Sequence, residues 1–330
     1  MSFTNRQNTS KGILFFVFLL FMILLPIIFP NPARLGMFIA CGVATVLASG
    51  WLLILRIGYF SIGQVAFLGT GAYTSALLAQ KLGVNPWWGL LWGGVLSGLI
   101  ALGIGLIFLK IRGLYFSIVT FAFAEVFRLG VSLVDFLGGH AGVLEIPKYS
   151  PISVPGWGVV RFESPFNCYY LLLGIVLISS IFMWRMDRSA LGRTFKSLTQ
   201  NEELAASLGI NTLYYKATAF VTASFFAGVA GAFTAHYYGC LYPGSYGVMQ
   251  SVFVQIQGTV GGAASVVFGG FLGGSLMVIT ETFLLNVDAR WISIFYGAVI
   301  IIITFVLPDG LLSLPQEIRR YRDQRKSKNR

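Results

Sequence analysis

The sequence predicts an all-α membrane protein, a polytopic bundle of about ten transmembrane helices. Hydrophobic residues make up 56% of the 330-residue chain and charged residues only 11%, whereas a soluble domain needs far more charge on its surface. Apolar stretches recur along the chain at the length that crosses a bilayer, about 20 residues. The 39 glycines fit the same class, because small residues let membrane helices approach one another closely.

The apolar stretches define the predicted spans. In order they are 12–30, 35–55, 59–80, 87–109, 113–136, 167–184, 217–239, 248–264, 266–286 and 291–307. The first follows Arg6 and Lys11 as in a signal peptide, but no small-residue cleavage site comes after it, so we interpret it as a retained anchor. The predicted organisation is therefore an N-terminal segment (1–11), a membrane domain (12–314) and a basic tail (315–330).

The distribution of basic residues orients the predicted helices. With the N-terminus inside, most of the 23 Lys and Arg residues fall on the cytoplasmic side, as the positive-inside rule requires. Both termini and the segment 185–216 are then cytoplasmic, and the loop 138–166 lies outside. The net charge of +11 does not indicate nucleic acid binding, because the basic residues form no face on a folded module. We expect the basic tail to contact an anionic leaflet.

Two apolar segments are interrupted by glycine, "GYFSIGQVAFLGTGAYTSALL" and "GTVGGAASVVFGGFLGGSLMV". In a bundle of two five-helix halves the second half is inverted, and such segments at matching places in the halves indicate a transport pathway. Helix breaks are therefore predicted at Gly63, Gly69, Gly71, Gly261 and Gly262. Close packing of helices through small residues is the competing explanation for the same glycines.

A polar stretch, "DRSALGRTFKSLTQNEELAASLGINTLYYK", separates two apolar regions. Thr199 and Glu202 have the spacing of a capping box, and Gly209 supplies a left-handed stop. We therefore expect a cytoplasmic helix of about nine residues with Leu204 and Leu208 on one face. A helix this short is marginal alone, so it must dock on the protein's own surface or in a groove of another subunit.

The motifs of this region resemble those of a transporter family. "NEELAASLGI" is similar to the coupling loop of ABC importer permeases, whose short helix fits a cleft on an ATPase subunit. "SIGQVAFLGTGAYTSALL", "RGLYFSIVTFAFAEVFR", "AGVAGAF" and "LPDGLL" resemble, in order, segments of branched-chain amino acid importer permeases of the LivM type. The resemblance implies that ATPase contacts are made by Glu202, Glu203, Ala205, Ala206, Leu208 and Gly209.

The same resemblance implies the partners and the location of the chain. They are a second, related permease, two ATPase subunits and an extracytoplasmic substrate-binding protein, in a bacterial inner membrane. ATP and Mg²⁺ would bind the ATPase subunits, since this chain has no Gly-x-x-x-x-Gly-Lys-(Ser/Thr) loop and is expected to hold no cofactor. Leu137 replaces a Thr of the family's outer turn, and Ala263 replaces a frequent Gly. The substrate thus stays open between branched-chain or related hydrophobic amino acids and urea or short amides.

Four polar residues within the apolar stretches are candidates for the substrate pathway. Ser61, Gln64 and Thr120 offer neutral hydrogen-bonding groups, which would equally serve as links between helices. Glu125 is a candidate because an acid at membrane depth is costly, although Arg128, three residues later, can pair with it.

An ion-coupled secondary transporter using Glu125 is the alternative function, but it leaves the short capped helix without a purpose. A membrane enzyme is disfavoured because no nucleophile–base cluster is present, and no catalytic residue is predicted. His140 and His236 lack partners at metal-ligand spacing, so no metal site is predicted. Cys168 and Cys240 both fall near outer ends of spans, where they act as small apolar residues or form a disulfide.

Overall fold

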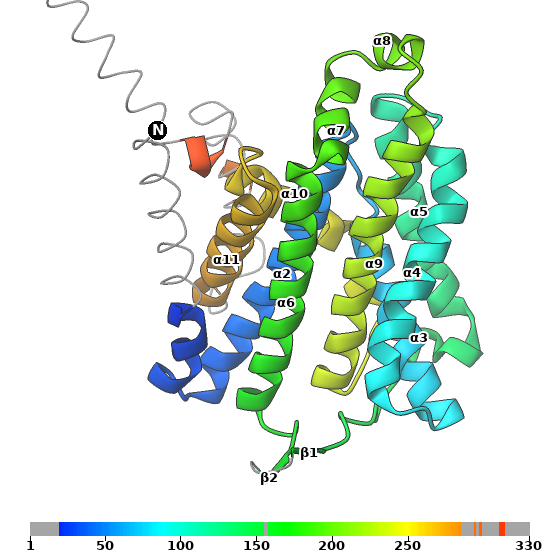
Figure 1. Ribbon diagram of the computed structural model, residues 1–330. Coiled ribbons are helices and arrows are strands. Elements are labelled where there is room, and N and C mark those ends of the chain that lie inside the picture. The colour runs from blue at the N-terminus through cyan, green and yellow to red at the C-terminus, as the bar shows by residue number, and fades with distance from the viewer. Residues whose placement is uncertain (1–19, 155–157, 285–293, 295–296, 299–309, 314–330) are drawn as a thin grey trace, which may run out of the picture.

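The computed structural model describes most of the chain. The described residues are 20–154, 158–284, 294, 297–298 and 310–313. They form long helices that lie side by side (Figure 1), so the predicted all-α, polytopic class is confirmed. The predicted span 291–307 and the first part of 12–30 lie almost entirely outside the described residues. The number of about ten spans and the inverted repeat therefore stay predictions.

The α-helices follow the predicted spans closely. In order they are α2 (Pro32–Leu55), α3 (Gln64–Leu82), α4 (Pro86–Phe108), α5 (Leu114–Leu133), α6 (Pro165–Arg188), α7 (Ala190–Gln200), α8 (Glu202–Ser207), α9 (Thr212–Tyr238), α10 (Val248–Gly261) and α11 (Val266–Leu284). Six of the described helices, α2, α4, α5, α6, α9 and α11, are long and apolar enough to cross a membrane. The chain is therefore a multi-pass membrane protein.

The two predicted extramembrane segments lie at opposite ends of the bundle. At one end α8 lies beyond the long helices, with α7 leading up to it, and at the other end the chain forms a short hairpin (Figure 1). The hairpin pairs β1 (Ile152–Val154) with β2 (Gly158–Val160) in antiparallel register. The 3-10 turns η1 (Asp135–Leu137) and η2 (Gly139–Ala141) precede it.

Three long helices begin with the same local signal. A polar side chain accepts a hydrogen bond from a first-turn amide, and proline occupies the first helical position. This arrangement satisfies an amide that has no partner within the helix, and proline's fixed φ is already helical. The pairs are Asn31–Pro32 in α2, Asn85–Pro86 in α4 and Ser164–Pro165 in α6.

Helix α9 packs against α2, α3 and α4 and forms the centre of the bundle. Glycine makes this packing close: a Cβ added at Gly71 would lie 2.0 Å from Gly228 O, and one at Gly231 would lie 1.9 Å from Leu68 O. The prediction of helix breaks at Gly69 and Gly71 was wrong, because both residues lie inside the continuous helix α3. Their small size serves contact between helices instead.

The other three predicted breaks coincide with helix ends. Gly63 is the N-cap of α3 and closes the irregular link 56–63. Gly261 is the last residue of α10, and Gly262 follows with a φ of +93°. The predicted span 248–264 is in fact the 14-residue helix α10, which at 1.5 Å per residue covers only about two thirds of a bilayer core. The 3-10 turn η3 (Pro243–Tyr246) leads into it, and η4 (Leu311–Ser313) lies near the C-terminus.

Candidate functional site

The short helix predicted in the polar stretch is α8, but it begins two residues later than the capping box implied. Asn201 caps it: its Oδ1 accepts a hydrogen bond of 2.9 Å from Leu204 N. Thr199 belongs to α7, and its hydroxyl donates to Arg56 O at 2.7 Å. The predicted capping box was therefore wrong. Asn is itself among the preferred N-cap residues, and here it stands directly before the helix.

The predicted stop at Gly209 is confirmed. Gly209 has a φ of +83°, and its amide donates to Ala206 O at 2.9 Å. The next amide, Ile210 N, donates to Ala205 O at 3.2 Å. These two bonds form a Schellman motif, in which a left-handed glycine satisfies the last carbonyl groups of a helix. The result is a compact unit of six helical residues with a defined chain direction at both ends.

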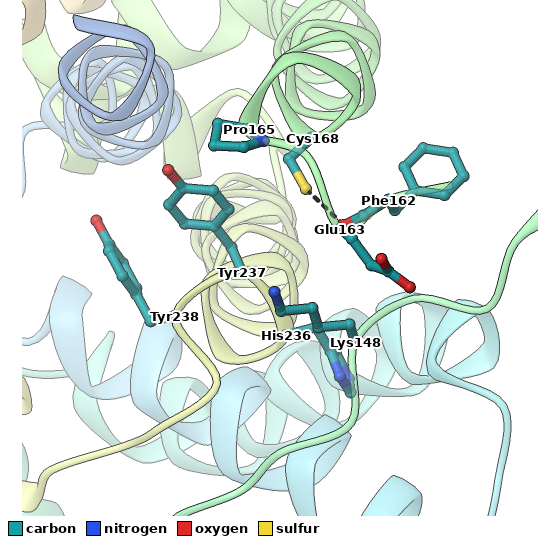
Figure 2. A pocket seen from close by; sticks show the side chains of 8 residues that line it. All are labelled: Lys148, Phe162, Glu163, Pro165, Cys168, His236, Tyr237 and Tyr238. Atoms are coloured by element: carbon teal, nitrogen blue, oxygen red, sulfur yellow. Dashed lines mark hydrogen bonds between the residues drawn. The ribbon is translucent and has the colours of Figure 1, made fainter. Parts of the chain in front are cut away.

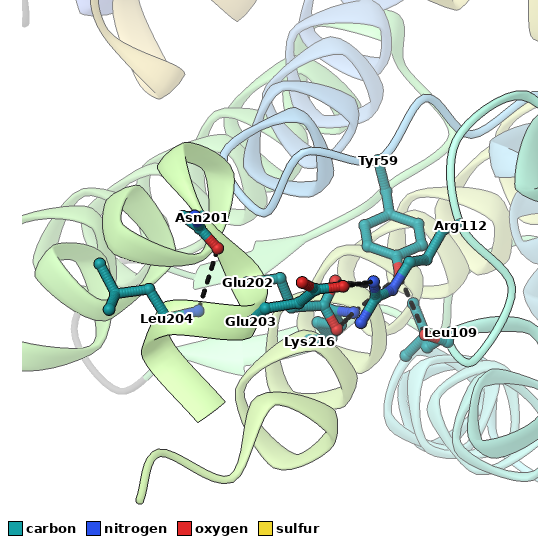
Figure 3. Close-up of polar contacts among 8 residues, drawn as sticks. All are labelled: Tyr59, Leu109, Arg112, Asn201, Glu202, Glu203, Leu204 and Lys216. Atoms are coloured by element: carbon teal, nitrogen blue, oxygen red, sulfur yellow. Dashed lines mark hydrogen bonds and ion pairs between the residues drawn. The ribbon is translucent and has the colours of Figure 1, made fainter. Parts of the chain in front are cut away.

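Helix α8 presents apolar side chains away from the bundle. Leu204 is 59% exposed and Leu208 is 74% exposed. Figure 3 shows Leu204 pointing away from the polar residues that lie behind the helix. Ala206 and Gly209 are exposed as well, whereas Ala205 is buried against the chain itself. Ala205 is one of the residues expected to contact an ATPase subunit. In the structure it packs α8 against the bundle.

An ion pair between a buried lysine and a partly exposed glutamate fastens the first residue of α8 to the rest of the molecule. Lys216 Nζ, at the start of α9, lies 2.5 Å from Glu202 Oε1 and donates to Tyr59 OH at 2.7 Å. The Tyr59 hydroxyl in turn donates to Leu109 O at 2.9 Å, just after α4 (Figure 3). The Lys216 side chain is only 3% exposed, and these partners offset the cost of burying its charge. The start of α8 is therefore tied to α9, to the link 56–63 and to the end of α4.

A more exposed pair lies beside this cluster. Arg112, between α4 and α5, donates from Nη1 to Glu203 Oε1 at 2.9 Å, and its Nε lies 3.6 Å from Glu202 Oε2. The hydrogen bond to Glu203, followed by the charge of Glu202, raises the pKa of Arg112 above its usual range. Solvent screens such a pair, so it contributes little to stability. Sequence reasoning missed the roles of Arg112, Tyr59 and Lys216, because they are far apart in the chain and form no local pattern.

The neutral residues predicted for the substrate pathway form hydrogen bonds in and around the link 56–63 and to α9. Thr120 Oγ1 accepts from Ile62 N at 3.0 Å, and Ser61 Oγ accepts from Gly63 N at 3.3 Å. Gln64 Nε2 donates to Ala223 O at 3.2 Å. Ser61, Gln64 and Thr120 are all buried. Thr120 thus joins α5 to the link and Gln64 joins α3 to α9, whereas the Ser61 hydroxyl bonds within the link itself. Their role in a substrate pathway stays a prediction.

Glu125 and Arg128 form the predicted ion pair on α5. Arg128 Nε donates to Glu125 Oε1 at 3.0 Å, and Nη2 contacts the same oxygen. The two side chains remain 35% and 31% exposed, respectively. Among the described residues no hydrogen bond joins this pair to Ser61, Gln64 or Thr120, so the four pathway candidates fall into two separate groups.

The end that carries the hairpin has a cavity of about 260 Å³, lined by Lys148, Phe162, Glu163, Pro165, Cys168, His236, Tyr237 and Tyr238 (Figure 2). His236 Nδ1 lies 2.6 Å from Pro147 O, and Nε2 lies 2.7 Å from Ser75 Oγ. Because a carbonyl only accepts, Nδ1 carries a proton, and the ring joins the loop 138–166 to α3. Cys168 and Cys240 are free thiols, so the disulfide alternative was wrong.

Comparison with known proteins identifies the family. The sequence profile described as "Branched-chain amino acid transport system / permease component" matches residues 34–304. The high-affinity branched-chain amino acid transport system permease protein LivM of Salmonella typhimurium (strain LT2) is 28% identical over 275 residues, 78% of this chain and 64% of the relative. LivM of Escherichia coli (strain K12) is 28% identical over 277 residues, with the same two shares.

A second group of relatives matches a smaller part of the chain. The permease protein LivH of Escherichia coli (strain K12) is 26% identical over 130 residues, 39% of this chain and 41% of the relative. The chain spans less than two thirds of the length of the LivM relatives that it matches. No solved structure matches. Because the family profile covers most of its length, the chain belongs to the family of branched-chain amino acid transport system permease components.

Proposed function

We propose that this chain is a membrane-spanning permease subunit of an ATP-driven importer and that α8 couples it to a separate ATPase subunit. One observation carries the proposal: α8 exposes Leu204 and Leu208 while Glu202 fastens it to the bundle. A short helix with an apolar face that its own chain leaves uncovered is suited to a groove on another protein. The α8 end of the bundle is then cytoplasmic, as are both termini.

The way α8 is attached supports a mechanical role. Glu202, Lys216 and Tyr59 connect α8 to α9 and to the link 56–63. Two hydrogen bonds carry the connection from that link to α5: Thr120 Oγ1 accepts from Ile62 N, and Ser117 Oγ donates to Phe60 O. A displacement of α8 by a partner would therefore act on several long helices at once. Coupling between two sites requires a continuous chain of contacts that can switch between two conformations. The contacts described here form such a chain from α8 to α5 and α9.

The relatives support the proposed cargo. LivM and LivH are both named as permeases of high-affinity branched-chain amino acid transport systems. We therefore propose branched-chain or related hydrophobic amino acids, delivered by a binding protein at the end that carries the hairpin, in a bacterial inner membrane. A second related permease and two ATPase subunits, which hold ATP and Mg²⁺, complete the assembly. Urea or short amides are the alternative cargo.

The ion-coupled transporter has less support. Its proposed ion site, Glu125, is engaged by Arg128 through two contacts to Oε1. An acid that carries protons must be able to release this partner in each cycle. The exposed face of α8 also has no purpose in such a transporter, whereas it is required in an importer driven by a separate ATPase.

The test is the variant Leu208→Asp in the assembled complex. A charge at this position would be buried without a partner at the ATPase interface, at a cost of several kcal/mol. We expect normal membrane insertion but loss of both the ATPase subunits and uptake, measured by pull-down in mild detergent and by transport of labelled leucine. Leu144→Asp is the control, since Leu144 is also an exposed leucine, at 49% exposure, but lies at the opposite end of the bundle. ATPase retained by Leu208→Asp at the level of the unmodified complex would refute the proposal.

A further inference from the structure

The ion pair on α5 is only partly covered by the chain itself. Glu125 and Arg128 lie in the middle of a 20-residue apolar helix, and about a third of each side chain is exposed. Both contacts within the pair use Oε1 of Glu125. Charged side chains within membrane helices face a bundle interior, a water-filled cavity or a polar partner, because contact with lipid tails is costly. Lipid tails alone are therefore not the surroundings of this part of α5.

The pair continues a stripe of exposed apolar residues. Leu114, Ile118 and Phe121 precede Glu125 at alternating spacings of four and three, which places them on the same side of the helix. All three are exposed. The stripe runs from the first residue of α5, near Arg112 and α8, to the ion pair about 20 Å away along the helix axis. The stripe combines an apolar contact surface with one charged pair, which can fix how a neighbouring helix is aligned along α5.

The exposed faces of two other helices differ from this stripe. Helix α4 contains no charged residue and exposes Trp92, Leu99 and Leu102, among others. Helix α6 exposes Ile178 and Phe182, and its charged residues are confined to its last turn. Lipid tails satisfy such surfaces without any protein partner. Among α4, α5 and α6, the face of α5 is thus the one that requires a polar neighbour.

We propose that the stripe on α5 formed by Leu114, Ile118, Phe121, Glu125 and Arg128 is the surface on which the second, related permease subunit packs. The inference rests on the proposed function, which supplies that subunit. The pair then faces polar groups of the partner permease at the subunit interface. Because α5 also begins beside Arg112 and Glu203, this interface extends from the membrane to the α8 region.

Photo-crosslinking of the assembled complex in membranes tests this assignment. The photoreactive amino acid p-benzoylphenylalanine replaces Phe121 on the stripe, and it replaces Trp92 on α4 or Phe182 on α6 as aromatic controls of similar exposure. We expect an adduct with the second permease from position 121 and no protein adduct from positions 92 and 182. The proposal is overturned by an adduct between two copies of this chain at position 121. The proposal is also overturned if the intact complex gives no adduct from position 121. An adduct with the second permease from position 92 or 182 overturns it as well.

A pair of bulky substitutions provides a second measurement. Ile118→Trp should overpack the interface and lower co-purification of the second permease about tenfold. Leu99→Trp, at an equally exposed position of α4, should leave co-purification unchanged. Equal recovery of the second permease with both variants would contradict the proposal. Membrane levels of each variant control for folding.

The two proposals fail in distinguishable ways. Leu208→Asp should remove the ATPase subunits while the adduct from position 121 still forms. If the ATPase stays bound and the adduct forms, the role of α8 is wrong and the α5 interface stands. If Leu208→Asp removes the ATPase, but the complex that keeps its ATPase gives no adduct from position 121, the α5 interface is wrong and the role of α8 stands.

Discussion

Lys216 Nζ lies 2.5 Å from Glu202 Oε1, so the start of α9 and the first residue of α8 are joined by a direct ion pair. The two partners differ in environment: the Lys216 side chain is 3% exposed and that of Glu202 is 21% exposed. The pair therefore offsets the cost of burying the lysine, whereas the glutamate retains access to solvent. A residue of the long central helix thus helps to hold the start of α8 in place.

Glu202→Gln should destabilise the protein, because it leaves the buried Lys216 ammonium without a counter-charge. We expect a loss of about 1–3 kcal/mol, below the value for a fully buried pair because Glu202 is partly exposed. The loss would be measured as a lower melting temperature of the purified protein in detergent. Glu203→Gln is the control: it removes only the exposed pair with Arg112 and should cost at most about 1 kcal/mol. Equal effects of the two variants would contradict the assigned role of Lys216.

Local signals in the sequence predicted the membrane helices and the end of α8, whereas contacts between distant residues could not be predicted. The apolar stretches predicted α2, α4, α5, α6, α9 and α11, because bilayer thickness sets the length of a span. Gly209 predicted the end of α8, because few other residues adopt a left-handed conformation. The cluster of Tyr59, Arg112 and Lys216 could not be predicted in the same way. It depends on how the ends of several helices meet.

The glycines show a second limit of sequence reasoning. A helix break and a close contact between helices both favour glycine, so the pattern alone does not distinguish Gly71 from Gly262. In the structure Gly262 has a positive φ, whereas Gly71 lies within α3 against the backbone of Gly228. The distinction depends on the neighbouring helix, which local spacing does not reveal. This is why two of the five predicted breaks were wrong.

Gly71→Ala should disrupt the packing of α3 on α9. The added methyl group would lie 2.0 Å from Gly228 O, a backbone atom that can move only with its helix. Overpacking of this kind costs about 1–3 kcal/mol. Gly103→Ala in α4 is the control, because no atom lies within 4 Å of the new Cβ, and it should raise helix stability by about 0.5–1 kcal/mol. Melting temperatures in detergent measure both, and an unchanged value for Gly71→Ala would argue against close α3–α9 contact.

The two ends of the bundle should react with reagents from opposite sides of the membrane. Lys196 in α7 and Glu163 before α6 are both exposed. The three native cysteines, Cys41, Cys168 and Cys240, are first replaced. Two variants of this cysteine-free protein then carry one cysteine each, Glu163→Cys or Lys196→Cys. An impermeant maleimide added to intact cells should label Glu163→Cys and should label Lys196→Cys only after the membrane is opened. Labelling of both from the same side is incompatible with the proposed topology.

The Glu125–Arg128 pair predicts the outcome of a charge exchange. Either single reversal, Glu125→Arg or Arg128→Glu, places two like charges three residues apart within a span and should abolish most uptake. The double exchange restores an opposite pair and should recover much of the activity. Uptake is measured with and without a proton gradient while ATP is maintained. An ion-coupled carrier would show no recovery, and its uptake would collapse with the gradient.

Gly209→Val should misdirect the chain where it leaves α8. The residue has a φ of +83°, and its amide closes the Schellman motif at Ala206 O. A β-branched residue in this conformation is strained by about 1–2 kcal/mol, and the strain is relieved if the last turn unwinds and displaces Leu208. We therefore expect weaker binding of the ATPase subunits and lower uptake, at an unchanged level of protein in the membrane.

The comparison variant is Gly209→Asn, because asparagine tolerates the left-handed conformation better than other residues with a side chain. It should retain most ATPase binding, although no atom of the chain lies within 4 Å of a Cβ in either variant. The two substitutions thus differ chiefly in backbone strain. If asparagine impaired binding as much as valine did, a side chain at this position would itself obstruct the partner. The role of Gly209 would then be to leave space for the ATPase, and the left-handed turn would be secondary.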